Sequence, residues 1–419
     1  MEKKYILILK GTILFTPTAG KFEIHPDSYL ISQGGLICGI YKDLPEEYKD
    51  LTIEDYGSSL IIPGFVDLHT HAPQFNQIGL GLDYKLLDWL NHYTFQEENK
   101  FSQIEYAQTV YEKFADTLVS SGTTRSAIFA TIHPQSCQIL FEILKRKGLG
   151  AYLGKVNMDT KCPDFIKENT QQSLSATEDL ILAWSDSELV KPIITPRFAP
   201  TSTRKLLEGL GKLALKYNLP VQSHLAENPG EIEWVQALFP EHDAYYKVYD
   251  HYNLFGQTPT LMAHCIHLTD DEIDILAKKK VVPVHCPDSN LNLTSGIMPT
   301  RKMLKAGVTI GLGSDIGAGH SLFMPQTIVR AIQLSKIYSL HHEEEAPLTL
   351  PEAFYMATKG GGSFFGKVGS FEPGYAADAL VIKNENLLSN LSPLEEIQRF
   401  IYTGSAQNIA ARYAVGKKL

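Results

Sequence analysis

The sequence predicts an α/β protein built on a (β/α)8 barrel, with a small β module formed from both ends of the chain. Three observations predict this architecture. Eight short β-rich runs alternate with helical stretches through the middle of the chain. Several of these runs end in polar, chemistry-bearing residues, at the end of the strand where barrel active sites form. Residues 1–62 and 370–419 instead show short strands punctuated by Gly and Pro.

The barrel elements can be placed in order along the chain. Helical runs, such as residues 106–121 and 204–218, separate several of the strands. Eight strands alternating with helices is the number that a (β/α)8 barrel requires. The candidate strands are residues 61–71, 122–130, 151–159, 191–199, 219–227, 260–268, 281–289 and 308–316.

Both ends of the chain have the pattern of β-structure, and we expect them to combine into one module. The division is then a composite β domain of residues 1–62 plus 370–419 and a barrel domain of residues 63–369. The segments that carry the pattern are residues 5–15, 34–44, 368–382 and 399–419.

Length and composition set the class of protein. The chain has 419 residues, which suits one large barrel with a smaller attached module. Hydrophobic residues make up 44% and charged residues 20%, as in globular proteins. The formal net charge is -9, and no basic stripe collects lysine and arginine, so we expect no nucleic-acid partner.

The N-terminal segment and the cysteines indicate the compartment. Residues 1–20 lack the long apolar run of a signal peptide, and no run approaches the ~18 apolar residues of a membrane helix. The 5 cysteines are scattered, with no C-x-x-C spacing, which argues against a disulfide framework and against a cysteine zinc site. We expect a cytoplasmic protein without a membrane partner.

Two histidines one residue apart end the first barrel strand. On a strand, His69 and His71 face the same way, into the barrel. Two neutral imidazoles held side by side form half of a zinc site. An isolated H-x-H pair is more often a pair of polar loop residues, because zinc needs three or four ligands.

Three further strand ends carry side chains of the same chemistry. His224 ends the fifth strand, His264 the sixth and Asp315 the eighth. Imidazole and carboxylate are ligands of catalytic zinc, which keeps one position for water. Because this end of a barrel carries function and the other carries stability, we expect a metal site here. His285 ends the seventh strand, and a role for it at the pocket rim stays open.

A glutamate follows the fifth strand. Glu227 lies three residues after His224, just beyond the strand end. A carboxylate in that place takes a proton from metal-activated water and passes it to a leaving nitrogen. A helix cap or a surface position is the alternative, and the neighbouring metal set favours acid–base chemistry.

The ordered motifs PGFVDLHTH, HLAE, AHCIHL, HCPDSN, GLGSDIGAG and EPGYAADALVI resemble the amidohydrolase superfamily over nearly the whole chain. The resemblance implies a distorted, TIM-like (β/α)8 barrel that binds a divalent metal, with a β-sandwich built from both termini. It also implies that Glu227 shuttles protons and that His264 and Asp315 orient the attacking water. The implied metal ligands are His69, His71, His224 and Asp315.

Within this superfamily the chain resembles the guanine deaminases. The segment LLDWLNHYTFQEE (86–98) is similar to that family's segment after the first strand. The resemblance implies that Gln74 and Arg197 hold a purine base and that Phe198 packs on it. The implied reaction is the zinc-dependent hydrolytic deamination of guanine to xanthine and ammonia, in purine catabolism or salvage. The resemblance also implies a homodimer.

The residue at the end of the fourth strand predicts a single metal ion. Binuclear members of the superfamily usually bridge two ions with a carboxylated lysine, often from this strand. Here the strand offers Arg197, which stays charged and cannot take that part. Its planar fork suits a purine edge, and a salt bridge to a carboxylate is the alternative role. We expect one zinc per chain, with iron left open because histidine and aspartate serve both.

Two other functions stay open. One is deamination of a different heterocycle: oxidised guanine, a pterin, an adenosine-type nucleoside or a chlorotriazine. Asp288 in HCPDSN and the glycines of GSDIGAG depart from the family pattern, which affects substrate choice at the rim. The other is a non-catalytic barrel, which would be expected to have lost ligands. The H-x-E…P-C-x-x-C signature of deaminases that act on nucleic acids does not occur, so we expect a free base.

Overall fold

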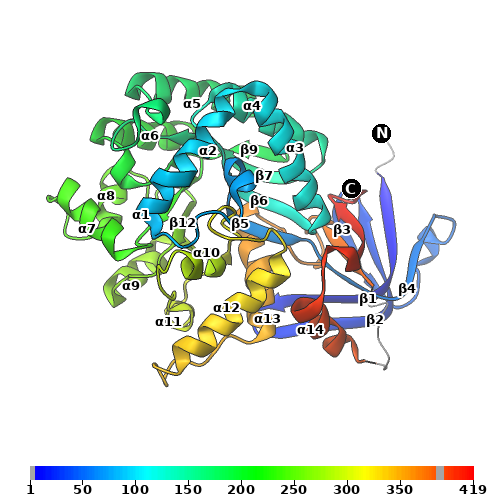
Figure 1. The fold of residues 1–419 in the computed structure, drawn as a ribbon. Helices are drawn as coiled ribbons and strands as arrows, with labels where there is room; N and C mark the ends of the chain where they lie inside the picture. Colours follow the sequence, from blue (N-terminus) through cyan, green and yellow to red (C-terminus); the bar gives the residue numbers. More distant parts are fainter. Residues whose placement is uncertain (1–4, 384–390) are drawn as a thin grey trace.

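Strands from both ends of the chain form one sheet, seen on the right of the computed structural model in Figure 1. The structure describes residues 5–383 and 391–419. The sheet order is β17-β16-β15-β4-β1-β2-β3, and β4 joins the two ends by pairing with β1 in parallel and with β15 antiparallel. The strands are β1 (Ile6–Thr18), β2 (Lys21–Gln33), β3 (Leu36–Tyr41), β4 (Glu54–Pro63), β15 (Ala379–Ile382), β16 (Ile409–Ala414) and β17 (Lys417–Lys418).

The predicted module of terminal strands is therefore confirmed. Its inner residues are apolar: Leu9, Ile13 and Ile61 pack with Val381 and Tyr413 in one buried cluster. The domain limits of 1–62 plus 370–419 and 63–369 stay a prediction.

Each of the eight predicted barrel positions holds a strand. The strands form two four-stranded sheets, β5-β6-β7-β9 and β11-β12-β13-β14, with parallel neighbours throughout. A parallel bridge between Ile194 and Val221 links the two sheets on one side. On the other side the Asp315 N–H donates to the His69 carbonyl at 2.8 Å. The strands are β5 (Phe65–His71), β6 (Thr123–Phe129), β7 (Gly150–Gly154), β9 (Val190–Pro192), β11 (Val221–Leu225), β12 (Thr260–His264), β13 (Val282–His285) and β14 (Gly311–Leu312).

Several barrel strands are shorter or more broken than predicted. The third divides into β7 and β8 (Val156–Asn157), and the fourth divides into β9 and β10 (Thr195–Pro196). Pro192 and Pro196 lie in the fourth strand, and proline has no N–H to donate to a ladder. These interruptions agree with the distorted barrel that was expected.

Helices cover the outside of the parallel strands (Figure 1). The two helical runs singled out from the sequence are confirmed as α3 and α6. None of the helices in the described ranges combines the length and the apolar character that a membrane crossing requires. The helices are α1 (Leu86–Trp89), α2 (Phe95–Asn99), α3 (Ile104–Ser120), α4 (Pro134–Arg146), α5 (Thr170–Trp184), α6 (Arg204–Tyr217), α7 (Pro229–Leu238), α8 (Tyr245–His251), α9 (Asp270–Lys279), α10 (Pro287–Asn292), α11 (Thr300–Lys305), α12 (Met324–Ser339), α13 (Leu350–Tyr355) and α14 (Pro393–Thr403).

Helix α6 shows why these segments form where they do. Leu206, Leu210 and Leu213 recur at helical spacing and are buried on one face. The helix begins after Thr203, whose side chain accepts a hydrogen bond from the Leu206 N–H at 3.2 Å. It ends at Asn218, which has left-handed backbone angles.

A buried ion pair fastens the terminal sheet to the barrel. Arg125 on β6 donates from Nε to Asp378 Oδ2 at 2.7 Å and from Nη2 to Oδ1 at 3.2 Å. Asp378, next to β15, also accepts the Val415 N–H at 2.7 Å. Both members of the pair are buried.

We expect Asp378→Asn to lower the free energy of unfolding by about 3 kcal/mol, because it leaves a buried guanidinium without its counter-charge. Chemical denaturation measures the loss. Glu208→Gln is the control: it removes an exposed pair with Lys212 and should leave stability nearly unchanged. An Asp378→Asn protein as stable as the parent would contradict the role given to this pair.

Candidate active site

The four side chains predicted as ligands converge at the C-terminal ends of the barrel strands. His69 and His71 end β5, His224 lies near the end of β11, and Asp315 follows β14. His71 Nε2 lies 3.2 Å from His224 Nε2. Asp315 Oδ1 lies 3.2 Å from His69 Nε2 and 3.5 Å from His71 Nε2.

The spacing of these four groups fits a single metal ion. Tetrahedral ligands at roughly 2.0–2.2 Å from zinc lie about 3.4 Å from one another, close to the three distances just given, and the donor atoms of His69, His71 and His224 all lie within 4.8 Å of one another. His69 Nε2 is buried and makes no hydrogen bond within the described part of the chain. A buried polar atom of this kind needs a partner, and a cation supplies one.

The electrostatics of the cluster favour ligand forms of the side chains. Burial, followed by the neighbouring His69 imidazole, holds the pKa of His71 and His224 well below the usual range, so both are neutral. Burial alone would raise the pKa of Asp315, but the histidines around it, His69 first, lower it well below its ordinary value. Neutral imidazole and ionised carboxylate are the forms that bind a metal.

Hydrogen bonds behind the cluster orient its members. The His224 Nδ1–H donates to the Arg197 carbonyl at 2.6 Å, which leaves the Nε2 lone pair facing the cluster. Asp67 on β5, a residue not singled out from the sequence, accepts the Ser314 N–H at 2.9 Å and so holds the loop that carries Asp315. Burial raises the pKa of Asp67 to about 6.

Glu227 lies beside the cluster, where the sequence predicted it. Its Oε2 is 3.3 Å from His264 Nε2, and that nitrogen is 3.8 Å from Asp315 Oδ2. Burial, followed by the nearby carboxylates of Glu231 and Asp315, raises the pKa of Glu227 well above its ordinary value. A carboxyl group in this setting holds a proton readily, as acid–base catalysis requires.

Glu231 supports Glu227 from behind and was missed in the sequence. Its Oε2 accepts the Glu227 N–H at 2.9 Å, and its Oε1 accepts the Tyr245 hydroxyl at 2.7 Å. It also completes a capping box with Asn228 at the start of α7. An asparagine followed three residues later by glutamate is a sequence signal for such a box.

A pocket with apolar walls adjoins the cluster. Phe198 is buried in the wall. Its ring packs edge to face against the ring of Trp234, with 6.0 Å between the two ring centroids. Apolar walls with a few convergent polar groups are typical of small-molecule sites. The residues that line the pocket are His71, Gln74, Leu86, Trp89, Leu90, Arg197, Phe198, His224, Glu227, His264, Leu293, Asp315 and Ala318.

A second buried glutamate missed in the sequence connects the polar groups of this pocket. Glu98 on α2 receives Arg197 Nη1 on one oxygen at 2.6 Å and Gln74 Nε2 on the other at 2.9 Å. All three side chains are buried. Arg197 therefore forms the salt bridge to a carboxylate that was the alternative to substrate binding in the sequence analysis. A guanidinium has five N–H donors, so one contact leaves others for a ligand.

Other residues considered from the sequence lie outside this pocket. His285 is buried with its Nδ1 unpaired among the described residues, and it does not line the pocket. Asp288 accepts a hydrogen bond from Arg330 Nε at 3.0 Å, between α10 and α12. Nothing in these contacts gives either residue a part in the site.

One cysteine lies close to the cluster, although no cysteine was expected there. The Cys286 sulfur belongs to a group with His69, His264 and Asp315 whose donor atoms lie within 4.8 Å of one another. Burial, followed by the Asp315 carboxylate, raises the thiol pKa well above its ordinary value. The thiol points to the Val284 carbonyl at 3.6 Å, so the histidine–aspartate set fits a metal better.

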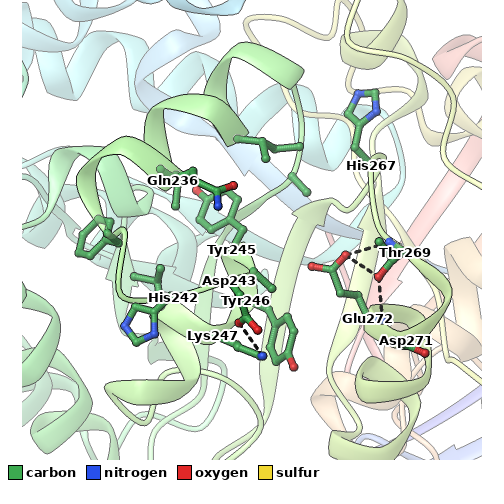
Figure 2. Close-up of a pocket in the computed structure, with 16 residues that line it drawn as sticks. Gln236, His242, Asp243, Tyr245, Tyr246, Lys247, His267, Thr269, Asp271 and Glu272 are labelled. Atoms are coloured by element: carbon green, nitrogen blue, oxygen red, sulfur yellow. Dashed lines mark hydrogen bonds and ion pairs between the residues drawn. The ribbon is translucent and has the colours of Figure 1, made fainter.

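A separate cavity lies on the outside of the barrel, between α7, α8 and the start of α9 (Figure 2). Two interactions join residues of its lining: Lys247 Nζ lies 2.6 Å from Asp243 Oδ1, and the Glu272 carboxylate accepts the Thr269 N–H at 2.8 Å. Tyr245 lines this cavity and donates to Glu231. The cavity contains none of the four convergent ligand groups, so it is not the candidate active site.

Comparison with known proteins agrees with this architecture. The amidohydrolase family model matches residues 60–416. The guanine deaminase of Dictyostelium discoideum is 40% identical over 448 aligned positions, covering 99% of this chain and 98% of that protein. The human guanine deaminase is 36% identical, covering 98% and 96%. A crystal structure of guanine deaminase from C. acetobutylicum with guanine bound in its active site is 50% identical, with a TM-score of 0.98 over 99% of this chain and 100% of that one.

Proposed function

Because the chain belongs to the amidohydrolase family, we propose that it is a hydrolase that converts guanine and water to xanthine and ammonia. The observation that carries this function is the meeting of three features in one pocket. These are the convergent histidine–aspartate cluster, the adjacent Glu227, and the polar pair of Gln74 and Arg197. The full-length similarity to guanine deaminases, one of them with guanine bound, supports the choice of substrate.

His69, His71, His224 and Asp315 would hold one divalent ion per chain, with zinc as the proposed metal. When bound, the ion supplies the Lewis acidity that brings the pKa of a water molecule towards neutrality. Iron serves the same ligand types, and metal analysis of the purified protein distinguishes the two.

Glu227 moves the protons of the reaction. Its carboxylate takes a proton from the attacking water and delivers it to the ring nitrogen beside the amino-bearing carbon of guanine. His264, 3.3 Å from Glu227 Oε2, and Asp315 orient the water. The oxygen of the water replaces the amino group at that carbon. The second proton of the water passes through Glu227 to the amino group, which leaves as ammonia.

The pocket holds the base through its polar pair and its aromatic wall. Arg197 stays charged and donates to a carbonyl oxygen of the base. Phe198 contributes an apolar surface for the flat ring. Gln74 contributes the second polar contact to the base, from a pocket wall that also includes His71, His224 and Asp315.

A substrate panel tests this assignment. We expect kcat/KM for guanine to exceed that for adenosine and for a chlorotriazine by about 100-fold or more, because a site built to hydrogen-bond one edge of guanine rejects rings that lack that edge. 8-Oxoguanine and a pterin share this edge with guanine, and they test how the pocket fits the rest of the ring. A higher value for another member of the panel would contradict the proposed substrate and leave the hydrolase chemistry in place.

We further propose that the protein acts in the cytoplasm as a homodimer on free bases and not on nucleic acid. The acidic net charge of -9 and the five free cysteines support this setting. Light scattering after size-exclusion chromatography tests the dimer: a mass of one chain would contradict it.

A further inference from the structure

A buried carboxylate that the reaction itself does not use contacts two residues that line the pocket, Gln74 and Arg197. Glu98 is 1% exposed and is held on α2, with one oxygen accepting Gln74 Nε2 and the other accepting Arg197 Nη1. A single group therefore places both side chains that would bind the base. Since the two oxygens belong to one carboxylate, the polar ends of Gln74 and Arg197 lie side by side.

The contact with Gln74 determines which end of its amide is free. An ionised carboxylate can only accept hydrogen bonds, so the amide nitrogen must face Glu98. The amide oxygen then faces away from Glu98, and it makes no hydrogen bond within the described part of the chain. That oxygen lies against Gly317, where an added Cβ would come within 2.2 Å of it. The backbone beyond Asp315 thus leaves room for this orientation.

The contact of Glu98 with Arg197 fixes the position of the hydrogen-bond donor that lies beside the Gln74 acceptor. Nη1 is bound to Glu98 at 2.6 Å, and the guanidinium carbon lies 5.4 Å from the centre of the Phe95 ring. The side chain is held on two sides and keeps further N–H donors. The pair therefore offers one hydrogen-bond acceptor, from Gln74, beside one donor, from Arg197.

We propose that Glu98 is a positioning residue that fixes this acceptor–donor order, and that the order selects a lactam edge. In a lactam a carbonyl oxygen stands beside a ring N–H, as at the 6-oxo and N1–H positions of guanine. In a base with a 6-amino group and an unprotonated N1, the amino group would face the Arg197 donor and N1 would face the Gln74 acceptor. Neither contact could form a hydrogen bond. The inference rests on the proposed function, because it names the edge of the substrate that this site reads.

The test compares the binding of two bases that differ at this edge and needs no turnover. Hypoxanthine has the lactam edge and carries no amino group between N1 and N3, whereas adenine has the 6-amino edge. Calorimetry on the metal-loaded protein should give a hypoxanthine affinity about 100-fold or more above that of adenine. In Glu98→Gln this ratio should fall by about tenfold or more, because glutamine offers one acceptor oxygen and lets the Gln74 amide turn over.

A matched control lies one residue away. Glu97 is also buried, but its carboxylate contacts Lys100 and Tyr106 instead of the base-binding pair. Glu97→Gln makes the same chemical change and should keep the parent ratio. If Glu98→Gln weakened the binding of hypoxanthine and adenine equally, the role of Glu98 would be purely structural and the proposal would be overturned. A parent protein that binds both bases with equal affinity would also overturn it.

A second variant covers the case in which Glu98→Gln does not fold. Gln74→Met keeps the ion pair of Glu98 and Arg197 but removes the acceptor, so the ratio should again fall by about tenfold or more. An unchanged ratio would overturn the proposal. A parent protein that leaves guanine intact but shows the Glu98-dependent ratio would contradict the proposed function and support the role of Glu98.

Discussion

Replacing Glu227 with glutamine is expected to lower kcat for guanine by about 10²–10⁴-fold while the metal content stays at one ion per chain. The amide has nearly the shape of the carboxylate but cannot take a proton from water and pass it to a ring nitrogen. The proposed ligand atoms on His69, His71, His224 and Asp315 are unchanged by the substitution. Steady-state kinetics together with metal analysis measures both effects.

The control for this substitution is Glu233→Gln. It makes the same chemical change in α7, at an exposed position, and should keep full activity. A Glu227→Gln protein that keeps most of its turnover would contradict the proton-transfer role. Loss of the metal from that variant would show instead that the carboxylate supports the ligand cluster.

Removing the metal with a chelator is expected to abolish turnover and to lower thermal stability. The donor atoms of the predicted ligands lie close together, at 3.2 Å for His71 and His224, 3.2 Å for His69 and Asp315, and 3.5 Å for His71 and Asp315, and they lose their shared partner. An ion present at about a thousand times its Kd contributes about 4 kcal/mol to folding. Activity assays and thermal scans before and after chelation measure the two losses.

Adding metal back distinguishes the loss of a specifically bound ion from general damage to the protein during chelation. Zinc should restore both stability and turnover, whereas magnesium, which prefers oxygen ligands, should restore neither. In Glu227→Gln, zinc should restore stability alone. Full activity in a completely demetallated protein would contradict the metal assignment.

Much of the fold and the centre of the site could be predicted because their signals are local. Alternation of β-rich and helical runs placed all eight barrel strands. His69 and His71 share a strand and therefore a face, and the remaining predicted ligands, His224 and Asp315, lie at or just beyond the ends of their own strands. Such positions meet in space once the strands are parallel.

The supporting groups could not be predicted because their partners are distant in the sequence. Glu98 pairs with Arg197 across 99 positions, and no periodicity or motif connects the two. Cys286 directly follows the end of β13 and lies close to the cluster, whereas only His285 was considered from the sequence at this strand end. Glu231 had a local signal, its capping box, but that signal indicates only a helix start.

The central claim is that one metal ion at this cluster enables water to replace the amino group of guanine. The most direct measurement is incubation of the zinc-loaded protein with guanine while xanthine and ammonia are quantified together. We expect both products in a one-to-one ratio, at a rate proportional to bound zinc up to one ion per chain. Guanine left intact by a protein that holds one zinc per chain would contradict the claim.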